Sequence, residues 1–578
     1  MSTSLTSAFS RLKTFARSPH VDDENLGDKL ESDSVGGGGH AARKSKITKS
    51  ELRVSHALKN FLVREKVLSE DEVGLDSDRP SGALRELLDR SHIDVPSYVT
   101  DRSHPLSEYY ISSSHNTYLL AHQLYGGAAA SAYQTALTTG SRCVEIDAWD
   151  DDDNENEPKV THGYTLASNV PFRAVCETVR DVIDHQATSS QGKPAPIWIS
   201  LENHCDAHGQ LRLAEIMREV WGQRLLSQAV REHGTKDQHE GSVHISLDEL
   251  DAKICVIVEY HIPAEADDDP SSSSSDEDEA ENDARRRYKQ KRKETPKVTI
   301  VPELAELGVY AQSVKPSNQS WLEGELTHGP HHHLINVSES AVSGLVPKYR
   351  ALIGRHNALH LMRVYPKGTR ISSANLNPVP FWGVGAQVCA LNWQTFDASM
   401  QLNEALFSGS DGYVLKPAAL RSGGTGHSNT GGRKRLRLHV AGATDLPVPE
   451  GHSAEDIRPY VTCTLVHPDD LDGEPPKRKT SVYKQHKLGI VHKGEQPPPT
   501  HPIWDEVLDW DYEDNDLAFL RILVKSDDKF AKNPVFAVAA VRLLYVVRDW
   551  SFIRLLDLKG RETHCSLLVK FQLDEVRW

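Results

Sequence analysis

Histidine, amide and carboxylate side chains gather in four short segments between residues 112 and 204 of this chain. The segments are SSSHNTYL at 112–119, RCVEIDAW at 142–149, THGY at 161–164 and PIWISLENH at 196–204. They supply two histidines, one amide and three carboxylates at the ends of apolar runs: His115, His162, Asn116, Glu145, Asp147 and Glu202. Cleavage of a phosphodiester requires two groups that transfer protons and a set of oxygen ligands for a hard cation.

The carboxylates predict a cation site. Glu145 and Asp147 are two residues apart on an expected strand, so both side chains point to one face. With Asn116 and Glu202 they offer one neutral and three anionic oxygen ligands, which suit Ca²⁺ better than zinc. Such an ion would lower the pKa of a coordinated hydroxyl and neutralise charge that develops on a phosphate.

The two histidines then have complementary roles. Either His115 or His162 would hydrogen-bond the phosphoryl oxygens as charge builds, and the other would protonate the leaving alkoxide. Taken singly, each residue has a simpler explanation, because a strand-end histidine is usually a core residue and a Glu-x-Asp pair usually lies on a salt-bridged surface. The joint pattern therefore carries the prediction.

Alternating apolar strands and helical stretches must position these residues. Between about 105 and 262 we expect strands at 144–148, 197–201 and 254–258, with helices at 171–184 and 211–229. The alternation resumes near 298, with strands at 334–337, 361–365 and 387–392. This order predicts a parallel sheet covered by helices, and in a barrel of that kind the chemistry lies at the carboxyl ends of the strands.

The flanking regions differ in composition from this α/β core. Residues 1–45 are expected to be a disordered tail, and 46–100 a small helical module without an Asp-x-Asp-x-Asp-Gly calcium loop. Residues 263–297 form an acidic, serine-rich and then basic linker between the two halves, 101–262 and 298–421. Residues 433–578 contain several short apolar runs and are expected to form a β-sandwich.

Composition excludes several classes of protein. The chain has 578 residues, which predicts two to four domains, and a net charge of −16, which argues against nucleic-acid binding. Its seven cysteines are scattered, without a Cys-x-x-Cys pair, so neither a zinc site nor a disulfide framework is indicated and a reducing compartment is expected. Because no apolar run of about 18 residues and no signal peptide are found, we expect a cytoplasmic protein that meets membranes peripherally and transiently.

The motifs resemble those of eukaryotic phosphoinositide-specific phospholipase C. Its X region is similar to the four segments above, and its Y region to RVYP at 363–366, QVCALNWQT at 387–395 and GYVLKP at 412–417. The resemblance implies an α/β fold with a split TIM-type barrel, an N-terminal EF-hand-like helical module and a C-terminal C2-like sandwich at 433–578. No pleckstrin-homology domain fits ahead of the helical module.

The resemblance also assigns roles. His115 matches the group that stabilises the transition state, and His162 matches the general acid. The calcium ligands match Asn116, Glu145, Asp147 and Glu202. Calcium and a nearby carboxylate, for which Glu145 is the candidate, would activate the inositol 2-hydroxyl to attack its own phosphodiester, and this proximity removes much of the entropic cost. Diacylglycerol would leave, and water could then open the cyclic inositol phosphate.

The headgroup pocket keeps part of the family pattern. Arg363 matches a phosphate ligand and Tyr365 a ring-stacking partner. The segment that the family commonly writes SFSE is NVSE here, with Asn336 and Ser338 as the candidate substrate contacts.

One strand departs from that pattern. Where animal enzymes have a lysine-x-lysine that binds ring phosphates, Ile257 and Glu259 stand near those positions. A carboxylate there would repel a 4- or 5-phosphate, while an ion pair of Glu259 facing elsewhere is an equal alternative. We therefore expect weaker selectivity for the bisphosphate over less phosphorylated phosphatidylinositols.

Three functions compete for this fold. An active calcium-dependent phospholipase C on membrane phosphoinositides is favoured, because both histidines and all four ligand positions are filled. A non-catalytic membrane adaptor would have lost one of them, and a metal-independent, bacterial-like phosphodiesterase would place a basic residue among the carboxylates.

In the C2-like region Arg458 stands where calcium-binding members usually have aspartate, which argues against calcium binding there. The acidic linker is either an autoinhibitory cover of the site or an inert solvated loop, and no motif indicates an upstream activator.

Overall fold

The fold comes from a computed structural model of the chain. It describes residues 25, 52–77, 80–119, 129–161, 169–189, 193–231, 245–261, 299–316, 318–323, 326, 329–330, 332–367, 374–429, 431–448, 451–471, 474–485, 496–527 and 534–576. The expected tail (apart from Asn25), the acidic linker and the predicted general acid His162 lie outside these residues.

Parallel strands from both halves of the chain form one closed barrel. In barrel order its strands are β2 (Ser113–His115), β3 (Cys143–Trp149), β6 (Ile197–Asn203), β7 (Ile254–Glu259), β8 (Gln312–Val314), β9 (His333–Ser338), β10 (Leu361–Tyr365) and β11 (Val388–Cys389). The sheet closes because β1 (Tyr109–Ile111) pairs with β11, and β12 (Leu391–Asn392) pairs with β2. β1 with β2, and β11 with β12, are consecutive parts of two extended segments, and β13 (Tyr413–Leu415) adds an antiparallel edge.

Helices cover the outside of the barrel. α5 (Ala130–Thr138), α6 (Phe172–Ser189) and α7 (Ala207–Trp221) pack on the first half, and α11 (Glu339–Leu359) packs on β9 and β10. Shorter helices α8 (Leu247–Leu250), α10 (Pro302–Ala305) and α12 (Val379–Trp382) fill the connections, and β4 (Lys159–Val160) and β5 (Val170–Pro171) extend the β3 edge.

The helix predicted at 211–229 is wrong at both ends. α7 begins after Asp206, whose side chain accepts a hydrogen bond from the Gly209 backbone N–H, and it ends at Trp221, directly before Gly222. Gly222 has a φ of 48°, which places it in the left-handed region that glycine adopts readily, so the chain leaves the helix there.

Apolar side chains fill the amino-terminal half of the barrel interior. Cys143, Trp198, Ile257, Leu334 and Leu361 belong to one buried cluster and come from β3, β6, β7, β9 and β10. Because side chains alternate along a strand, the residues two further along face the same interior at the carboxyl rim. These residues are polar or charged: Glu145, Ser200, Glu259, Asn336 and Arg363.

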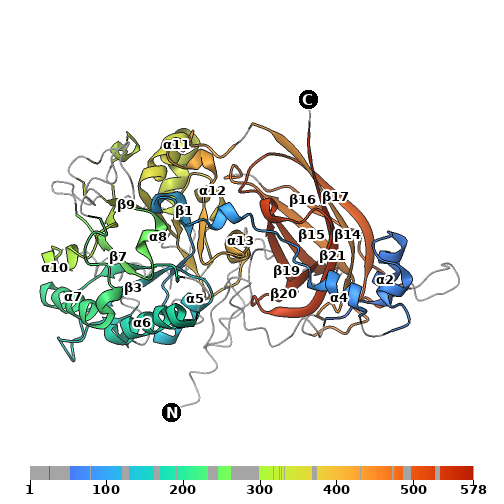
Figure 1. The fold of residues 1–578 in the computed structure, drawn as a ribbon, viewed down its shortest axis with the longest axis horizontal. Coiled ribbons are helices and arrows are strands. Elements are labelled where there is room, and N and C mark those ends of the chain that lie inside the picture. The colour runs from blue at the N-terminus through green and yellow to red at the C-terminus, as the bar shows by residue number, and fades with distance from the viewer. Residues whose placement is uncertain are drawn as a thin grey trace, which may run out of the picture.

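The C-terminal region is an all-β sandwich. Its strands are β14 (Arg433–Thr444), β15 (Pro459–Val466), β16 (Lys477–Lys479), β17 (Ile503–Glu513), β18 (Phe519–Ser526), β19 (Val535–Arg542), β20 (Trp550–Leu556) and β21 (Glu562–Glu575). All of their pairings are antiparallel. Helix α13 (Ala398–Phe407) lies between barrel and sandwich (Figure 1) and contacts β18 and β19, where Arg521 Nε donates to Gln401 Oε1 at 2.7 Å.

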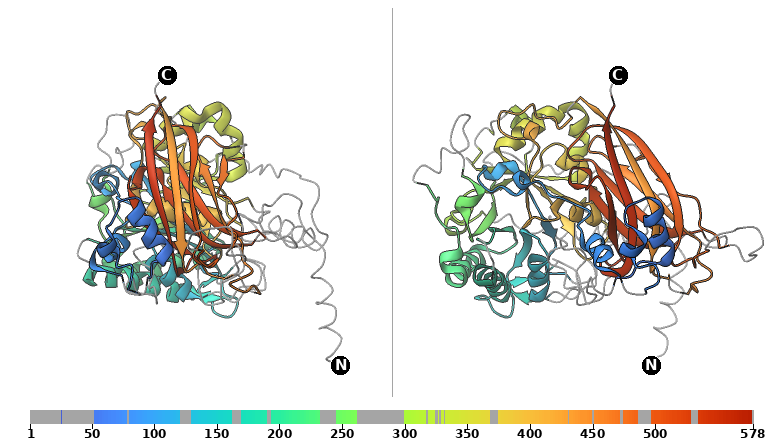
Figure 2. Two further views of the ribbon diagram at one scale, coloured as in Figure 1. Left: turned by 90° about the vertical axis from the view of Figure 1, so that its right-hand side faces the viewer. Right: turned by 45° about the vertical axis from the view of Figure 1, so that its right-hand side comes forward.

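The N-terminal helices pack on the sandwich. They are α2 (His56–Arg64), α3 (Glu70–Val73) and α4 (Gly82–Asp89), and they lie against the sandwich in both views of Figure 2. Phe61 meets Trp550 edge to face at 5.2 Å, and Arg64 Nη2 pairs with Asp505 Oδ2 at 2.6 Å. The predicted fold class, a split barrel with a helical module and a terminal sandwich, is confirmed. Among the described residues no helix has the length and apolar character needed to cross a bilayer.

Candidate functional site

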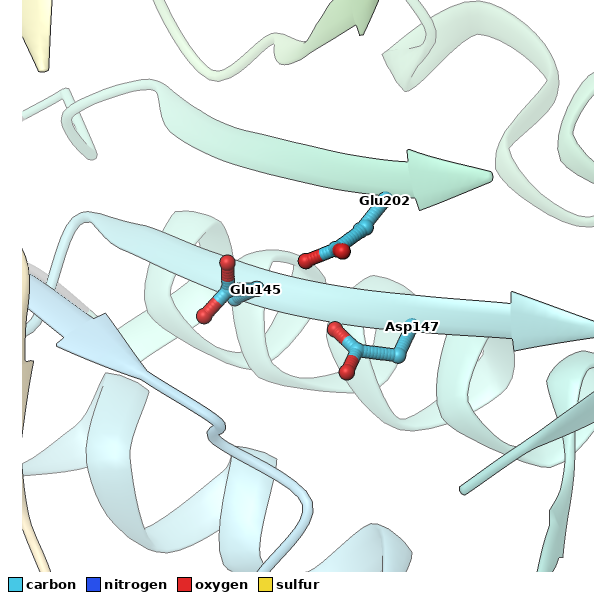
Figure 3. A group of neighbouring side chains, drawn as sticks. All are labelled: Glu145, Asp147 and Glu202. Carbon is cyan, nitrogen blue, oxygen red and sulfur yellow. The ribbon is translucent and has the colours of Figure 1, made fainter. Parts of the chain in front are cut away.

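Three carboxylates meet at the carboxyl rim of the barrel. Glu145 and Asp147 come from β3, and Glu202 comes from the neighbouring strand β6, where it lies opposite Asp147 in the strand register. One oxygen of each lies within 4.8 Å of the others, and Figure 3 shows the three groups converging on one point. The parallel register of β3 and β6 thus brings together carboxylates that are far apart in the sequence.

One oxygen of this cluster lacks a hydrogen-bond donor. Asp147 Oδ2 accepts from the Tyr118 hydroxyl at 2.7 Å, whereas Asp147 Oδ1 is buried with no such partner among the described residues. A buried anionic oxygen of this kind is costly unless a cation or a donor meets it. A hard divalent ion would supply that partner, so the residues present fit an oxygen-binding cation.

The charges of the cluster act on its own members. Burial, and then the neighbouring charges of Glu202 and Glu145, raise the pKa of the Asp147 carboxyl well above its usual range. Burial would also raise the pKa of Glu202, but a hydrogen bond with His204 and the charges of His204, Lys315 and Arg363 lower it to about 2. Asp147 thus lies next to two negative carboxylates, whereas Glu202 is also close to the positive charges of Lys315 and Arg363.

Asn116 lies beside the carboxylates in a constrained conformation. Its φ is 47°, a left-handed value that asparagine tolerates better than most residues. This turn directs its backbone N–H onto Glu145 Oε2 at 2.8 Å, and its Oδ1 lies 3.2 Å from the Tyr118 hydroxyl. Its amide oxygen thus shares a neighbour with Asp147.

His115 is held by a residue that the sequence analysis did not select. Its Nδ1 lies 2.8 Å from Oδ1 of Asn392, which is its register partner on β12. Because an amide oxygen only accepts, Nδ1 carries the proton and Nε2 faces the site, 3.8 Å from Glu145 Oε2. The QVCALNWQT motif contained this asparagine, but its contact with His115 follows from barrel closure.

Arg363 occupies the interior of the rim. Its Nη2 pairs with Glu145 Oε1 at 2.5 Å and its Nη1 donates to Asn336 Oδ1 at 3.2 Å. Tyr365 lies next to it, with the guanidinium 5.9 Å from the ring centre. Ser338 caps α11 by accepting from the Ala341 N–H at 3.3 Å, so the structure gives it a local structural role at the same rim.

Two further side chains at the rim were not selected from the sequence. His204 stacks on Trp149 with ring centres 4.0 Å apart, and its Nε2 lies 3.3 Å from Glu202 Oε1. Lys315, directly after β8, places its Nζ 3.7 Å from Glu259 Oε1. Of the two alternatives for Glu259, the ion pair is therefore present, although it lies at the rim. Ile257 is buried in the apolar interior below it.

Comparison with known proteins gives a family for each large unit. Residues 102–260 match the family model "Phosphatidylinositol-specific phospholipase C, X domain", residues 304–419 match its Y domain, and residues 434–548 match the C2 domain. The crystal structure of PLC21 of L. pealei has the same fold, with a TM-score of 0.68 at 23% identity, covering 90% of this chain and 62% of that one.

Two of the curated relatives share the name 1-phosphatidylinositol 4,5-bisphosphate phosphodiesterase. A 1-phosphatidylinositol 4,5-bisphosphate phosphodiesterase of Dictyostelium discoideum is 32% identical over 474 residues, which covers 75% of this chain and 55% of the relative. The human delta-1 form is 30% identical over 505 residues, with coverages of 82% and 61%. The chain thus spans little more than half the length of these relatives.

Proposed function

Since residues 102–260 and 304–419 are X and Y domains of phosphatidylinositol-specific phospholipase C, we propose that this chain is a calcium-dependent phospholipase C of intracellular lipid signalling. Its substrates are phosphatidylinositol phosphates, the bisphosphate named for its relatives and less phosphorylated forms, and its products are diacylglycerol and inositol phosphates. The observation that carries the proposal is the buried, donor-less Oδ1 of Asp147 beside Glu145 and Glu202.

The calcium ligands in this proposal are Asn116, Glu145, Asp147 and Glu202. When bound, calcium supplies positive charge that activates the inositol 2-hydroxyl and offsets charge on the phosphate. The proposal is supported by the three carboxylates, which two neighbouring strands bring within 4.8 Å of one another without an ion, and by Asn116 on the turn beside them. Such preorganisation is what an electrostatic site requires, because no reorganisation is then needed during the reaction.

The proton-transfer residues are His115 and His162. The contact with Asn392 fixes the ring of His115 with a proton on Nδ1, so that Nε2 faces the substrate; when Nε2 is protonated as well, it can donate a hydrogen bond to the phosphoryl oxygens. His162 is the general acid for the departing diacylglycerol oxygen, a role that rests on the THGY motif. Glu145 is the proposed base for the 2-hydroxyl, whose attack on its own phosphodiester gives a cyclic inositol phosphate.

The headgroup contacts are Arg363, Tyr365, Asn336 and Ser338. Arg363 is held by Glu145 and Asn336, so binding of a headgroup phosphate must compete with, or extend, these two contacts. The protein is proposed to reach its lipid from the cytoplasmic side as a peripheral protein, with the C2 domain as a second contact to the membrane.

Hydrolysis of vesicle-bound phosphatidylinositol and its 4,5-bisphosphate, with calcium or with excess chelator, tests the proposal. We expect turnover only with calcium, and losses of about 10²- to 10⁴-fold in His162→Ala and His115→Ala. His185→Ala, an exposed histidine on α6, is the matched control. Equal turnover in chelator, or full activity of both variants, would reject calcium-assisted histidine catalysis. Vesicle binding without any turnover would instead support the non-catalytic adaptor.

A further inference from the structure

Lys315 lies at the carboxyl rim of the barrel, directly after β8, which is the strand next to the one that carries Glu259. β7 and β8 are parallel, and Glu259 is the register partner of Ser313. Ile257, two residues before Glu259, lies in the apolar interior, so Glu259 and Ser313 face the interior as well. Lys315 is two residues beyond Ser313 and continues on that inner face, where its Nζ reaches Glu259 at 3.7 Å.

The positive charge of Lys315 acts on Glu202 in the carboxylate cluster. It is among the positive charges that lower the pKa of Glu202, together with His204 and Arg363. The neighbouring strand β9 carries Asn336, which follows Ile335, the register partner of Val314. Lys315 is thus level with a proposed headgroup contact and close to a proposed calcium ligand.

Lys315 is more exposed to solvent than Arg363. The Arg363 side chain is 6% exposed, and both of its terminal nitrogens meet protein oxygens. The Lys315 side chain is 50% exposed, and its contact with Glu259 is longer. An exposed ion pair of this kind is weak, so the contact with Glu259 does not prevent the ammonium from meeting a further anion.

A ring phosphate of an inositol lipid is the anion that fits this place. Each phosphate monoester carries a charge of about −1.5 to −2 near neutral pH and offers several acceptor oxygens. A lysine ammonium binds such a group as a point charge without a fixed geometry. The carboxylate of Glu259 lies beside it and reduces the attraction.

We propose that Lys315 is a specificity-determining residue that contacts a ring phosphate of the headgroup, and that Glu259 attenuates this contact. The inference rests on the proposed function and deepens it. In this chain the positive charge for the ring phosphates comes from Lys315, directly after β8, while β7 contributes the opposing carboxylate of Glu259. Selectivity for phosphorylated headgroups is therefore retained but set lower than Lys315 alone would give.

The test measures kcat/KM on vesicles that contain phosphatidylinositol, its 4-phosphate or its 4,5-bisphosphate in a neutral carrier lipid. We expect Lys315→Met to lower turnover of the phosphorylated lipids by about tenfold, with phosphatidylinositol changed by less than about twofold. Lys315→Arg retains the preference, and Glu259→Gln increases it. Lys193→Met is the matched control, because Lys193 is exposed and lies before the opposite, amino-terminal end of β6.

Binding of soluble inositol 1,4,5-trisphosphate and inositol 1-phosphate, measured by calorimetry, separates this inference from the proposed function. Loss of trisphosphate affinity in Lys315→Met, with inositol 1-phosphate unchanged, supports the role of Lys315 even in a protein that turns over no lipid. An equal loss on all three lipids, or no loss in either assay, overturns the role of Lys315 without contradicting the proposed phospholipase function.

Discussion

Replacement of Arg363 by methionine tests the electrostatic design of the site most directly. The Arg363–Glu145 pair is buried, with side chains 6% and 4% exposed and a separation of 2.5 Å. Methionine fills much of the same volume but leaves Glu145 without its cation, beside Asp147 and Glu202. Removing one partner of a buried pair costs about 3 to 5 kcal/mol, because the remaining charge stays desolvated.

Urea unfolding followed by tryptophan fluorescence, in the presence of a chelator, measures this loss. We expect Arg363→Met to lower the free energy of unfolding by about 3 to 5 kcal/mol. The double variant Arg363→Met/Glu145→Gln should recover most of the loss, because it leaves no unpaired charge at this position. A bound cation would replace the missing charge, so calcium should raise the midpoint of Arg363→Met more than that of the wild type.

Two outcomes would refute this reasoning. A loss below about 1 kcal/mol in the single variant would mean that water or a rearranged neighbour already compensates Glu145. A double variant no more stable than Arg363→Met would show that lost packing, and not an uncompensated carboxylate, causes the change.

Two more predictions concern titratable groups. Burial lowers the pKa of His356 from 6.5 to about 4; the unfolded chain therefore takes up the proton first, and stability present above pH 6.5 is lost as pH falls toward 4, by about 3 kcal/mol. His356→Gln should remove this part of the slope in unfolding curves at successive pH values, and an unchanged slope would contradict the assignment. Burial and the charges of Glu202 and Glu145 disfavour the ionised form of Asp147, so Asp147→Asn should raise the melting temperature in chelator and abolish the calcium-induced increase. A normal calcium response in that variant would exclude Asp147 as a ligand.

The barrel could be predicted from the sequence where its strands are continuous apolar runs, as at residues 254–258 of β7, and not where polar residues form them. The segment that contains β1 and β2 was not predicted as a strand, because Ser112, Ser113 and Ser114 interrupt its apolar pattern. These serines are nevertheless buried, and the hydroxyls of two of them have partners inside the protein. The Ser113 hydroxyl donates to the Cys389 carbonyl at 2.6 Å, and Ser114 Oγ lies 3.0 Å from the Thr117 hydroxyl.

Local sequence motifs predicted which residues belong to the site, but they did not predict which of these residues contact one another. Glu145 and Asp147 are neighbours on one strand, so the spacing of the letters already determines their common face. Arg363 lies 218 positions away from Glu145, and only the closed barrel makes them partners. His115 and Asn392 meet for the same reason, 277 positions apart.

The charge at the barrel rim depends on residues from neighbouring strands, as Lys315 beside Glu259 shows, and cannot be predicted from one strand alone. A single lysine followed by Pro316 after a three-residue strand gives no signal in the sequence, because such residues are ordinarily solvated. Its distance from Glu259 depends on the β7–β8 register, which the intervening linker hides from any local pattern. The missing lysine pair at Ile257 and Glu259 predicted a loss of ring-phosphate selectivity, yet in a parallel barrel the neighbouring strand reaches the same point from about 5 Å away. On the proposed role of Lys315, the selectivity of this pocket depends on β7 and on the residue that directly follows β8.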